Sequence, residues 1–154
     1  MAQLTIKGQK ALDDLQKQLT QATNNQLEDY FLDIADDAIN MSPVWSGAYV
    51  KSFSFKADNS SSRGRRIDGA NWRFPKQTGS EADREAGRDA LKGDVRAAFA
   101  DKSKLPEEKS YTIRNDANHA RFVEDGIEGP TGPKGNETPL NGYRIFGRLK
   151  SRYG

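Results

Sequence analysis

The sequence predicts an α+β fold, in which a long N-terminal helix and a second helix pack on a small, mainly antiparallel β-sheet with long loops. Apolar residues recur every three or four positions through the first 41 residues, which is typical of a helix. Two later segments, 52–56 and 111–114, alternate between polar and apolar residues, as strands do. The 154 residues suffice for one domain, so residues 1–154 are expected to share a single core.

Residues 1–41 are expected to form the N-terminal helix, because neither Pro nor Gly interrupts the chain from Gln9 to Met41. A helix of that length would extend about 45 Å, which is more than the width of a small domain. Part of it is therefore expected to project from the body and dock elsewhere. Asn24 and Asn25 are poor helix formers, so a break into two helices is the alternative. The apolar stripe consists of Leu12, Leu15, Leu19, Ala22, Tyr30, Phe31, Ile34 and Ala38.

A short turn is expected to end this helix and lead into the first strand. Pro43 cannot continue a helix, and it disfavours the helical conformation in the residue before it. Ser46 can bond to the backbone of the turn, and Gly47 permits a positive φ, so the chain is expected to reverse there into the strand. The predicted structural turn comprises Ser42, Pro43, Val44, Ser46 and Gly47.

Residues 59–79 are rich in Ser, Arg, Gly and Asn without any period, which predicts a long excursion loop. Ser80 and Asp83 then have the spacing of a helix cap, which predicts a second helix to about Asp101. Two interior glycines weaken this helix by about 1 kcal/mol each relative to Ala, so it is expected to depend on tertiary contacts. Its stripe of mainly small residues comprises Ala82, Ala86, Ala90, Leu91, Val95, Ala98 and Phe99.

The C-terminal third is expected to complete the sheet. The segment from His119 to Glu124 follows the turn formers of residues 115–118, so it is expected to be a strand joined by a tight turn to residues 111–114. Residues 127–154 are expected to be a glycine- and proline-rich loop followed by a basic C-terminal arm, with a last short strand from Tyr143 to Phe146.

The composition indicates a small core. Hydrophobic residues make up 34% of the chain and charged residues 30%. Either partner subunits complete the apolar surface or the chain has long disordered loops. The net charge of +2 hides a division: residues 1–41 hold three Lys against seven Asp or Glu, a balance of −4, whereas residues 134–154 hold five basic residues against one acidic residue, a balance of +4. Ends of opposite charge can pair between subunits.

No catalytic, cofactor or metal site is predicted. The chain has no cysteine and one histidine, His119, so a zinc site would need carboxylates for its remaining ligands. We expect His119 instead to be a polar residue at a strand edge beside a turn. Ser46, Ser52 and Ser54 lack the Gly-x-Ser-x-Gly context of an activated nucleophile. Without an apolar run of 18 residues or a signal pattern, we expect a cytoplasmic protein with no membrane partner, unless a larger particle carries it out.

Nucleic-acid binding is an alternative interpretation of the basic residues. Arginines of the 59–79 loop lie near Trp72 and Phe74, and basic side chains bind phosphates while aromatic rings stack on bases. The nearly neutral net charge and the absence of a recognisable binding fold favour contact with another subunit instead. The residues predicted for DNA or subunit contact are Arg63, Arg65, Arg66, Arg148, Lys150 and Arg152.

Two motifs, Ser42 to Phe53 and Asn118 to Gly126, resemble those of the tail-completion and neck proteins of tailed bacteriophages, with the lambdoid minor tail protein Z family as the nearest. That family's signature is a Pro-Val-x-Thr/Ser-Gly turn before a basic strand, and later a Tyr/His-Ala-x-x-Val-Glu-x-Gly strand. The resemblance covers residues 27–55 and 111–126, and the basic, aromatic C-terminus departs from it. The second motif comprises His119, Ala120, Val123, Glu124 and Gly126.

Elementary chemistry assigns roles within the second motif. Ala120 is small enough for close packing, Val123 is expected to face the core, and Gly126 is expected to end the strand. Glu124 is expected either to pair with a basic residue such as Lys51 or to be solvated.

The resemblance implies a structural virion protein without catalytic activity. Such a subunit forms a ring, commonly a hexamer, at the neck between the head connector and the tail. Its implied partners are its own copies, the connector or adaptor, and the tail tube or terminator proteins. The chain would be assembled in the host cytoplasm and reside in the virion. A tail terminator subunit is the close alternative, and basic loops near the ring lumen would touch DNA without reading its sequence.

Overall fold

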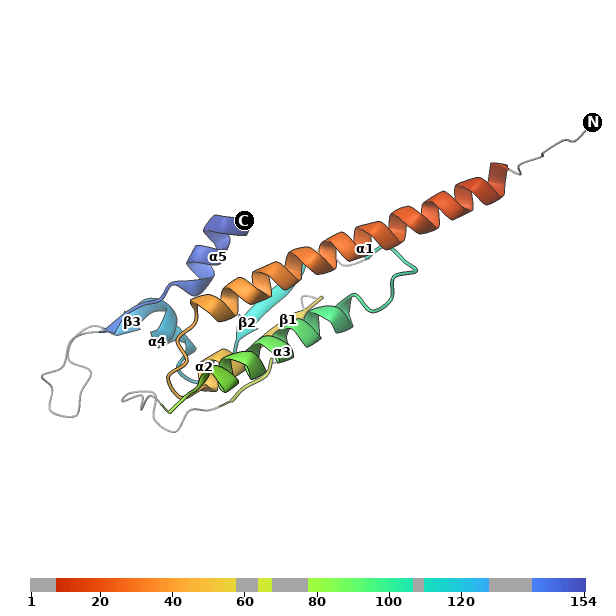
Figure 1. The fold of residues 1–154 in the computed structure, drawn as a ribbon. Coiled ribbons are helices and arrows are strands. Elements are labelled where there is room, and N and C mark those ends of the chain that lie inside the picture. Colours follow the sequence, from red (N-terminus) through yellow and green to blue (C-terminus); the bar gives the residue numbers. More distant parts are fainter. Residues whose placement is uncertain (1–7, 58–63, 68–77, 107–109, 128–139) are drawn as a thin grey trace, which may run out of the picture.

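The molecule has the α+β class that the sequence predicts, as Figure 1 shows. Two helices, α1 (Gly8–Met41) and α3 (Glu81–Ala98), pack along one another. They lie beside a two-stranded antiparallel sheet of β1 (Phe53–Lys56) and β2 (Thr112–Asn115). The N-terminal part of α1 extends well beyond the other elements (Figure 1). The computed structural model describes residues 8–57, 64–67, 78–106, 110–127 and 140–154.

The helix α1 is continuous, so the long N-terminal helix is confirmed and the alternative break at Asn24 and Asn25 is wrong. Asn24 is 2% exposed. Its side-chain amide donates to the carbonyl of Thr20 (3.0 Å) and to that of Lys104 (2.8 Å), which belongs to the segment after α3. These hydrogen bonds to the backbone offset the low helix propensity of asparagine, and the one to Lys104 fastens α1 to the body at this point.

The turn after α1 has the predicted conformation, but the element that follows it is not the predicted strand. Ser42 Oγ donates to the Ala38 carbonyl at 2.6 Å, and Gly47 has a φ of 78°. Ser46 Oγ accepts a hydrogen bond from the backbone amide of Ala48 at 3.4 Å. The chain does not reverse directly into a strand, because one helical turn, α2 (Ala48–Lys51), intervenes before β1. This turn buries its Ala, Tyr and Val side chains, which a strand would divide between two faces.

The predicted cap of α3 is confirmed. Ser80 Oγ accepts from the Asp83 backbone amide (3.4 Å), and the Asp83 carboxylate accepts from the Ser80 amide (2.9 Å). The helix ends at Ala98, earlier than expected, and its predicted small-residue stripe is only partly right. Its buried residues are Gly87, Leu91 and Val95, whereas Ala82, Ala86 and Ala98 are exposed.

Gly87 is required by close packing between α3 and α2. A Cβ at this position would lie within 3.0 Å of the Val50 carbonyl oxygen, so a side chain here would push the two helices apart. Gly93 differs, because a Cβ there would meet nothing within 4 Å. Gly87 thus weakens α3 locally but is needed for the contact between α3 and α2, whereas Gly93 has no such role.

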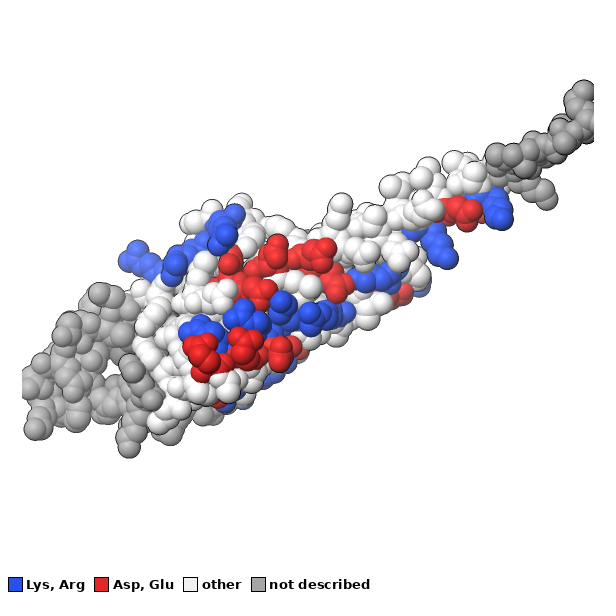
Figure 2. All heavy atoms as spheres, viewed as in Figure 1, with Lys and Arg blue, Asp and Glu red and all other residues white. Residues whose placement is uncertain are grey.

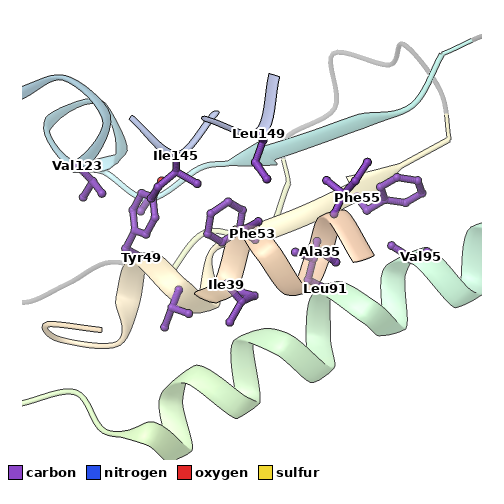
Figure 3. Close-up of a cluster of buried hydrophobic side chains, with 14 of the residues drawn as sticks. Ala35, Ile39, Tyr49, Phe53, Phe55, Leu91, Val95, Val123, Ile145 and Leu149 are labelled. Carbon is purple, nitrogen blue, oxygen red and sulfur yellow. The ribbon is translucent and has the colours of Figure 1, made fainter. Parts of the chain in front are cut away.

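The core lies between the helices and one face of the sheet. In the sheet, Phe53 is opposite Asn115 and Phe55 is opposite Ile113. Figure 3 shows side chains from α1, α3, α5 and β1 meeting around Phe53. At the end of the body nearer the N-terminus of α1, aromatic rings pack together with centroids 4.7 to 6.4 Å apart. These rings belong to Phe31, Phe55, Phe99 and Tyr111.

The segment expected to be a second strand at 119–124 is instead a short helix, α4 (Ala120–Asp125). The His119 carbonyl accepts from the amides of residues 122 and 123 (3.0 and 3.2 Å), and Val123 is fully buried. Ala120 packs against the core, as expected. Gly126, with a φ of 82°, ends a helix and not a strand, and leads into β3 (Gly126–Ile127), which pairs with β4 (Leu140–Asn141).

The C-terminus is also helical, so the strand expected from Tyr143 to Phe146 is wrong. Helix α5 (Ile145–Tyr153) forms because Ile145 and Leu149, four residues apart, both enter the core. The predicted basic arm is therefore this helix, packed on α1. Most of the preceding loop (128–139), and most of the excursion loop (58–63 and 68–77), lie outside the described residues.

Candidate assembly surfaces

The structural turn is packed against the start of α3. A Cβ at Gly47 would lie 2.6 Å from Asp83 Cγ, so the turn fits under this side chain only as glycine. Lys51 Nζ contacts Asp83 Oδ1 at 2.6 Å, and this hydrogen bond is the main reason that the pKa of Asp83 is lowered. The turn, the cap of α3 and the end of α2 thus form one contact.

The two motifs meet in the structure. Tyr49 Oη donates to Glu124 Oε1 at 2.8 Å, and the Phe146 amide donates to Glu124 Oε2 at 3.1 Å. Asn115 Nδ2 donates to the Tyr49 carbonyl at 2.8 Å. Both expectations for Glu124 are therefore wrong: it neither pairs with Lys51 nor is left to solvent. It joins α2, α4 and α5.

Tyr49 is a structural donor in this junction. It is 1% exposed, and burial, followed by the charge of Glu124 and the hydrogen bond to it, raises the pKa of the phenol far above its usual range. The phenol therefore keeps its proton and remains available to Glu124. This hydrogen bond joins the first motif to the second.

The second motif also holds the C-terminal helix. The amide of Tyr143 donates to the Val123 carbonyl at 2.8 Å, and that of Arg144 donates to the Glu124 carbonyl at 3.1 Å. A Cβ at Gly142 would lie within 3.0 Å of the same Glu124 carbonyl oxygen, so only glycine permits this approach. Helix α5 is consequently fixed relative to both motifs.

Helix α5 presents a basic surface. A groove of about 560 Å³ follows this helix, and it is lined by Arg144, Gly147, Arg148, Ser151 and Arg152. Within the described part of the chain, no ion pair engages Arg144, Arg148 or Lys150, and all three are exposed. Figure 2 shows Lys and Arg side chains over this helix.

The opposite charges of the two ends meet within one chain at α1 and α5. Arg152 Nη1 lies 2.8 Å from Asp37 Oδ2, to which Tyr153 Oη also donates at 2.5 Å. The hydrogen bond to Asp37 raises the pKa of Tyr153. The acidic and basic ends of the sequence, which could have paired between subunits, thus form an ion pair within one chain at this contact.

A second charged contact joins α1 to α3. Asp36 accepts from Arg88 Nη1 (2.9 Å) and Lys92 Nζ (2.8 Å). Burial opposes ionisation of Asp36, but the hydrogen bonds from these two cations outweigh it and lower its pKa. In Figure 2, acidic side chains of α1 lie directly beside the basic side chains of α3. This surface charge is largely committed to holding the body together.

The N-terminal part of α1 presents a different kind of surface. Residues 8–19, which we call the arm, are exposed throughout. Three leucines of the arm are exposed to 62%, 52% and 60%, and Leu105, from the segment after α3, to 56%. A groove of about 680 Å³ runs beside these side chains, which are Leu12, Leu15, Leu19 and Leu105.

The arginines predicted for DNA or subunit contact have different surroundings. Arg65 donates to the Phe53 carbonyl (2.6 Å) and to Asp94 (2.9 Å), so its guanidinium is occupied within the fold. Arg66 is exposed. Arg63 lies outside the described residues, as do Trp72 and Phe74.

His119 is 3% exposed and precedes α4, which corrects its predicted position at a strand edge. Its Nδ1 lies 2.8 Å from Asn118 Oδ1, and its ring packs 6.1 Å from that of Tyr49. Among the residues that the structure describes, no group of three His, Asp or Glu side chains could hold a metal ion.

Sequence reasoning missed two residues of these surfaces. Tyr49 lies inside the first motif, but only its contact with Glu124 shows its role. Leu105 is a single leucine among charged and polar residues from 101 to 109, and this isolation is the signal that could have identified it. The leucines of the arm belong to the same predicted apolar stripe as Ile34 and Ala38, and their spacing alone does not show which part of the helix projects from the body.

Comparison with known proteins adds no relative: no family model, curated protein or solved structure matches the chain. None of the helices in the described ranges is long and apolar enough to cross a bilayer.

Proposed function

We propose that the chain is a structural virion protein of a tailed bacteriophage. In this proposal it forms a hexameric ring at the head–tail interface, where it completes the tail and joins it to the head connector. Its partners are its own copies, the connector or adaptor, and the tail tube or terminator. The proposal starts from the resemblance of the two motifs to those of tail-completion and neck proteins.

The projecting arm is the observation that carries the proposal. Residues 8–19 make no core of their own, yet they hold three of the large hydrophobic side chains that are most exposed in the described structure. Contiguous exposed apolar surface on a small protein is typical of an interaction site. An arm that leaves the body and carries such a surface suits a subunit that reaches its neighbours.

The packing of the two motifs supports the same proposal. The two motifs, residues 42–53 and 118–126, are far apart in sequence, but Tyr49 and Glu124 connect them by a partly buried hydrogen bond. The motifs therefore define one rigid body from which α1 and α5 leave in fixed directions. A ring requires this property, because small errors in the angle between neighbours accumulate around the circle.

Helix α5 favours a second, accompanying role in contact with DNA. Arg144, Arg148 and Lys150 are exposed, and within the described residues they have no acidic partner. Cations on one helix bind phosphates independently of sequence. If α5 faces the ring lumen, we expect salt-sensitive DNA binding that an Arg144→Gln/Arg148→Gln variant weakens, whereas Arg121→Gln, on α4, leaves it unchanged.

Labelling of virions tests the proposed function. Antibodies against the purified chain, applied to particles of the phage that encodes it, should mark the junction of head and tail, and quantitative mass spectrometry should find six copies per particle. Absence of the chain from purified particles would contradict the proposal. Cross-linking to the connector indicates tail completion, whereas cross-linking to the tail tube alone indicates a terminator.

A further inference from the structure

We propose that the groove along α5 binds the sugar–phosphate backbone of duplex DNA, with Arg144 and Arg148 as its cations and Gly147 as the position that lets the backbone come close. This inference rests on the DNA contact proposed for α5, and it names the form of the nucleic acid and the residues that seat it. Three features of α5 support it: the side of the helix on which the groove lies, the conformation of Arg144 and the polar lining.

The groove lies on the side of α5 that faces away from the body. Ile145 and Leu149 enter the core, and each residue turns a helix by about 100°. Gly147 and Ser151 therefore lie on the side opposite these two, where both are exposed, and the arginines of the groove lie along one flank. A ligand can thus reach the groove without displacing the packing of α5 on the core.

The floor of the groove carries almost no side chain. A Cβ at Gly147 would meet only Arg144 Cβ, at 3.9 Å, so the described fold has room for a side chain here. Glycine nevertheless weakens the interior of a helix relative to alanine. Ser151 Oγ donates to the Gly147 carbonyl at 3.1 Å, which holds this hydroxyl against the helix. The glycine leaves space for the close approach of another backbone, as glycine does where a ligand lies directly on the chain.

Arg144 has a conformation that costs stability. Its φ and ψ are 50° and 43°, in the left-handed region that residues other than glycine rarely adopt. The fold holds it there, because its amide donates to the Glu124 carbonyl at 3.1 Å and its carbonyl accepts from the Arg148 amide at 2.9 Å. Within the described residues, its guanidinium makes no ion pair in return. Backbone strain of this kind gathers at binding sites, and here it places a cation at the head of the groove.

The lining of the groove favours nucleic acid over a protein partner. It consists of Arg, Gly and Ser, whereas the centre of a protein–protein interface is depleted of charged residues and enriched in aromatic ones. Protein–DNA interfaces are polar and strongly positive, as this lining is. Arg152, at the C-terminal end of the groove, is already paired with Asp37, so Arg144 and Arg148 supply the free charge.

The aromatic rings of α5 favour a duplex over a single strand. Single-strand binding uses exposed rings on which bases stack. In α5, Phe146 packs on Phe53 and Tyr153 packs on Tyr30, with ring centroids 6.0 and 5.7 Å apart. A duplex carries one phosphate for about every 1.7 Å of its axis, which exceeds the charge density of a single strand. Arginines four residues apart on a helix, about 6 Å along its axis, therefore find phosphates on a duplex without touching a base.

Fluorescence anisotropy with a labelled duplex and with one of its strands tests this inference. The wild type should bind the duplex severalfold more tightly. Gly147→Leu should weaken duplex binding severalfold although the charge is unchanged, whereas Gly93→Leu, at an open and exposed site on α3, should not. Equal affinity of the two variants would overturn the close approach. Equal or tighter binding of the single strand would overturn the choice of a duplex, and tighter binding of polyglutamate would assign the groove to an acidic protein.

Matched cations test whether the groove or the overall charge attracts DNA. Arg148→Gln should weaken duplex binding severalfold, and Lys150→Gln, which removes the same charge from α5 outside the groove, should weaken it clearly less. Equal losses would overturn the groove. Arg144→Gly should weaken binding while the thermal midpoint stays or rises, because glycine relieves the left-handed strain. A fall in both would show that Arg144 supports the fold, and would overturn its role in the groove.

Virion analysis separates this inference from the proposed function. If the wild type is absent from virions but Gly147→Leu and Arg148→Gln weaken duplex binding as expected, the neck function is wrong and the groove stands. If the wild type lies at the neck but both variants bind duplex DNA as the wild type does, the groove is wrong and the neck function stands.

Discussion

The two halves of α1 share one helix but differ in what surrounds them. Between residues 27 and 41 the side chains of Ile34, Ala35, Ala38 and Ile39 are buried, whereas every residue from 8 to 19 is exposed. The packed half supplies the nucleus from which helix formation extends into the arm, since adding a residue to an existing helix is far easier than starting one. Equal helicity therefore does not mean an equal role: one half builds the fold, and the other presents a surface.

The border between the halves is built from contacts with the segment after α3. Asn24 bonds to the Lys104 carbonyl, and Lys102 pairs with Glu28. Lys102 also lies 5.9 Å from the centroid of the Phe99 ring. Beyond this point the arm has no hydrogen bond to the body within the described residues. Substitutions on either side of the border test this division, and the largest effect is expected in the packed half.

Ile39→Ala should lower the free energy of unfolding by about 2 to 5 kcal/mol, because it leaves a cavity where the side chain is fully buried. The matched change in the arm, Leu15→Ala, should alter it by less than about 0.5 kcal/mol in dilute, unassembled protein. Urea denaturation followed by circular dichroism measures both. Similar losses for the two variants would show that the arm belongs to the core.

Gly87→Ala should destabilise the body by about 1 to 3 kcal/mol, because the added methyl group would press on the Val50 carbonyl. Gly93→Ala on the same helix should stabilise it by about 0.5 to 1 kcal/mol, since that site is open and alanine is the better helix former. Thermal unfolding of the two variants gives the comparison. Stabilisation by both would refute the close contact between α2 and α3.

Asn24→Ala should cost about 1 kcal/mol, because it removes the hydrogen bond that ties α1 to the Lys104 carbonyl. Asn25→Ala, at an exposed position, should stabilise the helix by a few tenths of a kcal/mol. Hydrogen exchange should show that only Asn24→Ala loosens the amides on both sides of this border. Equal behaviour of the two variants would show that the border between the two halves of α1 does not lie at Asn24.

Asp36 should give the smallest effect, seen as a dependence on pH. Because its cationic partners lower its folded pKa below the ordinary 3.8, its contribution is present above that value and is lost as the pH falls through the folded pKa. Wild type and Asp36→Asn should thus differ in stability at pH 6 and converge in acid. Asp14→Asn in the exposed arm should follow the wild type at both pH values; a difference there like that of Asp36→Asn would contradict the division.

Local rules predicted the first half of the fold well. The uninterrupted helix to Met41, the positive φ of Gly47 and the reciprocal cap of Ser80 and Asp83 each follow from the chemistry of a few neighbouring residues. Tertiary contacts decided the rest. Phe122 and Val123 favour a strand by propensity. The segment instead forms a helix that buries Val123 and ends at Gly126, whose φ is positive.

The candidate surfaces were less predictable, because apolar spacing does not reveal which side of a helix meets the body. Leu19 and Ile34 belong to equally regular patterns, yet one is exposed and the other is buried. Charge pairing was equally ambiguous: Lys51 had several acidic candidates, and the fold places it beside Asp83 while Tyr49 takes Glu124. These choices depend on contacts between residues that are distant in sequence.

The mass of the assembly in solution tests most directly the claim that the arm is a surface for other copies of the chain. Native mass spectrometry should find the wild type as a multiple of the 17.1-kDa chain. A Leu12→Asp/Leu15→Asp/Leu19→Asp variant should be monomeric, with an unchanged thermal midpoint of its body. The same mass for the two proteins, or a variant that no longer folds, would contradict the account.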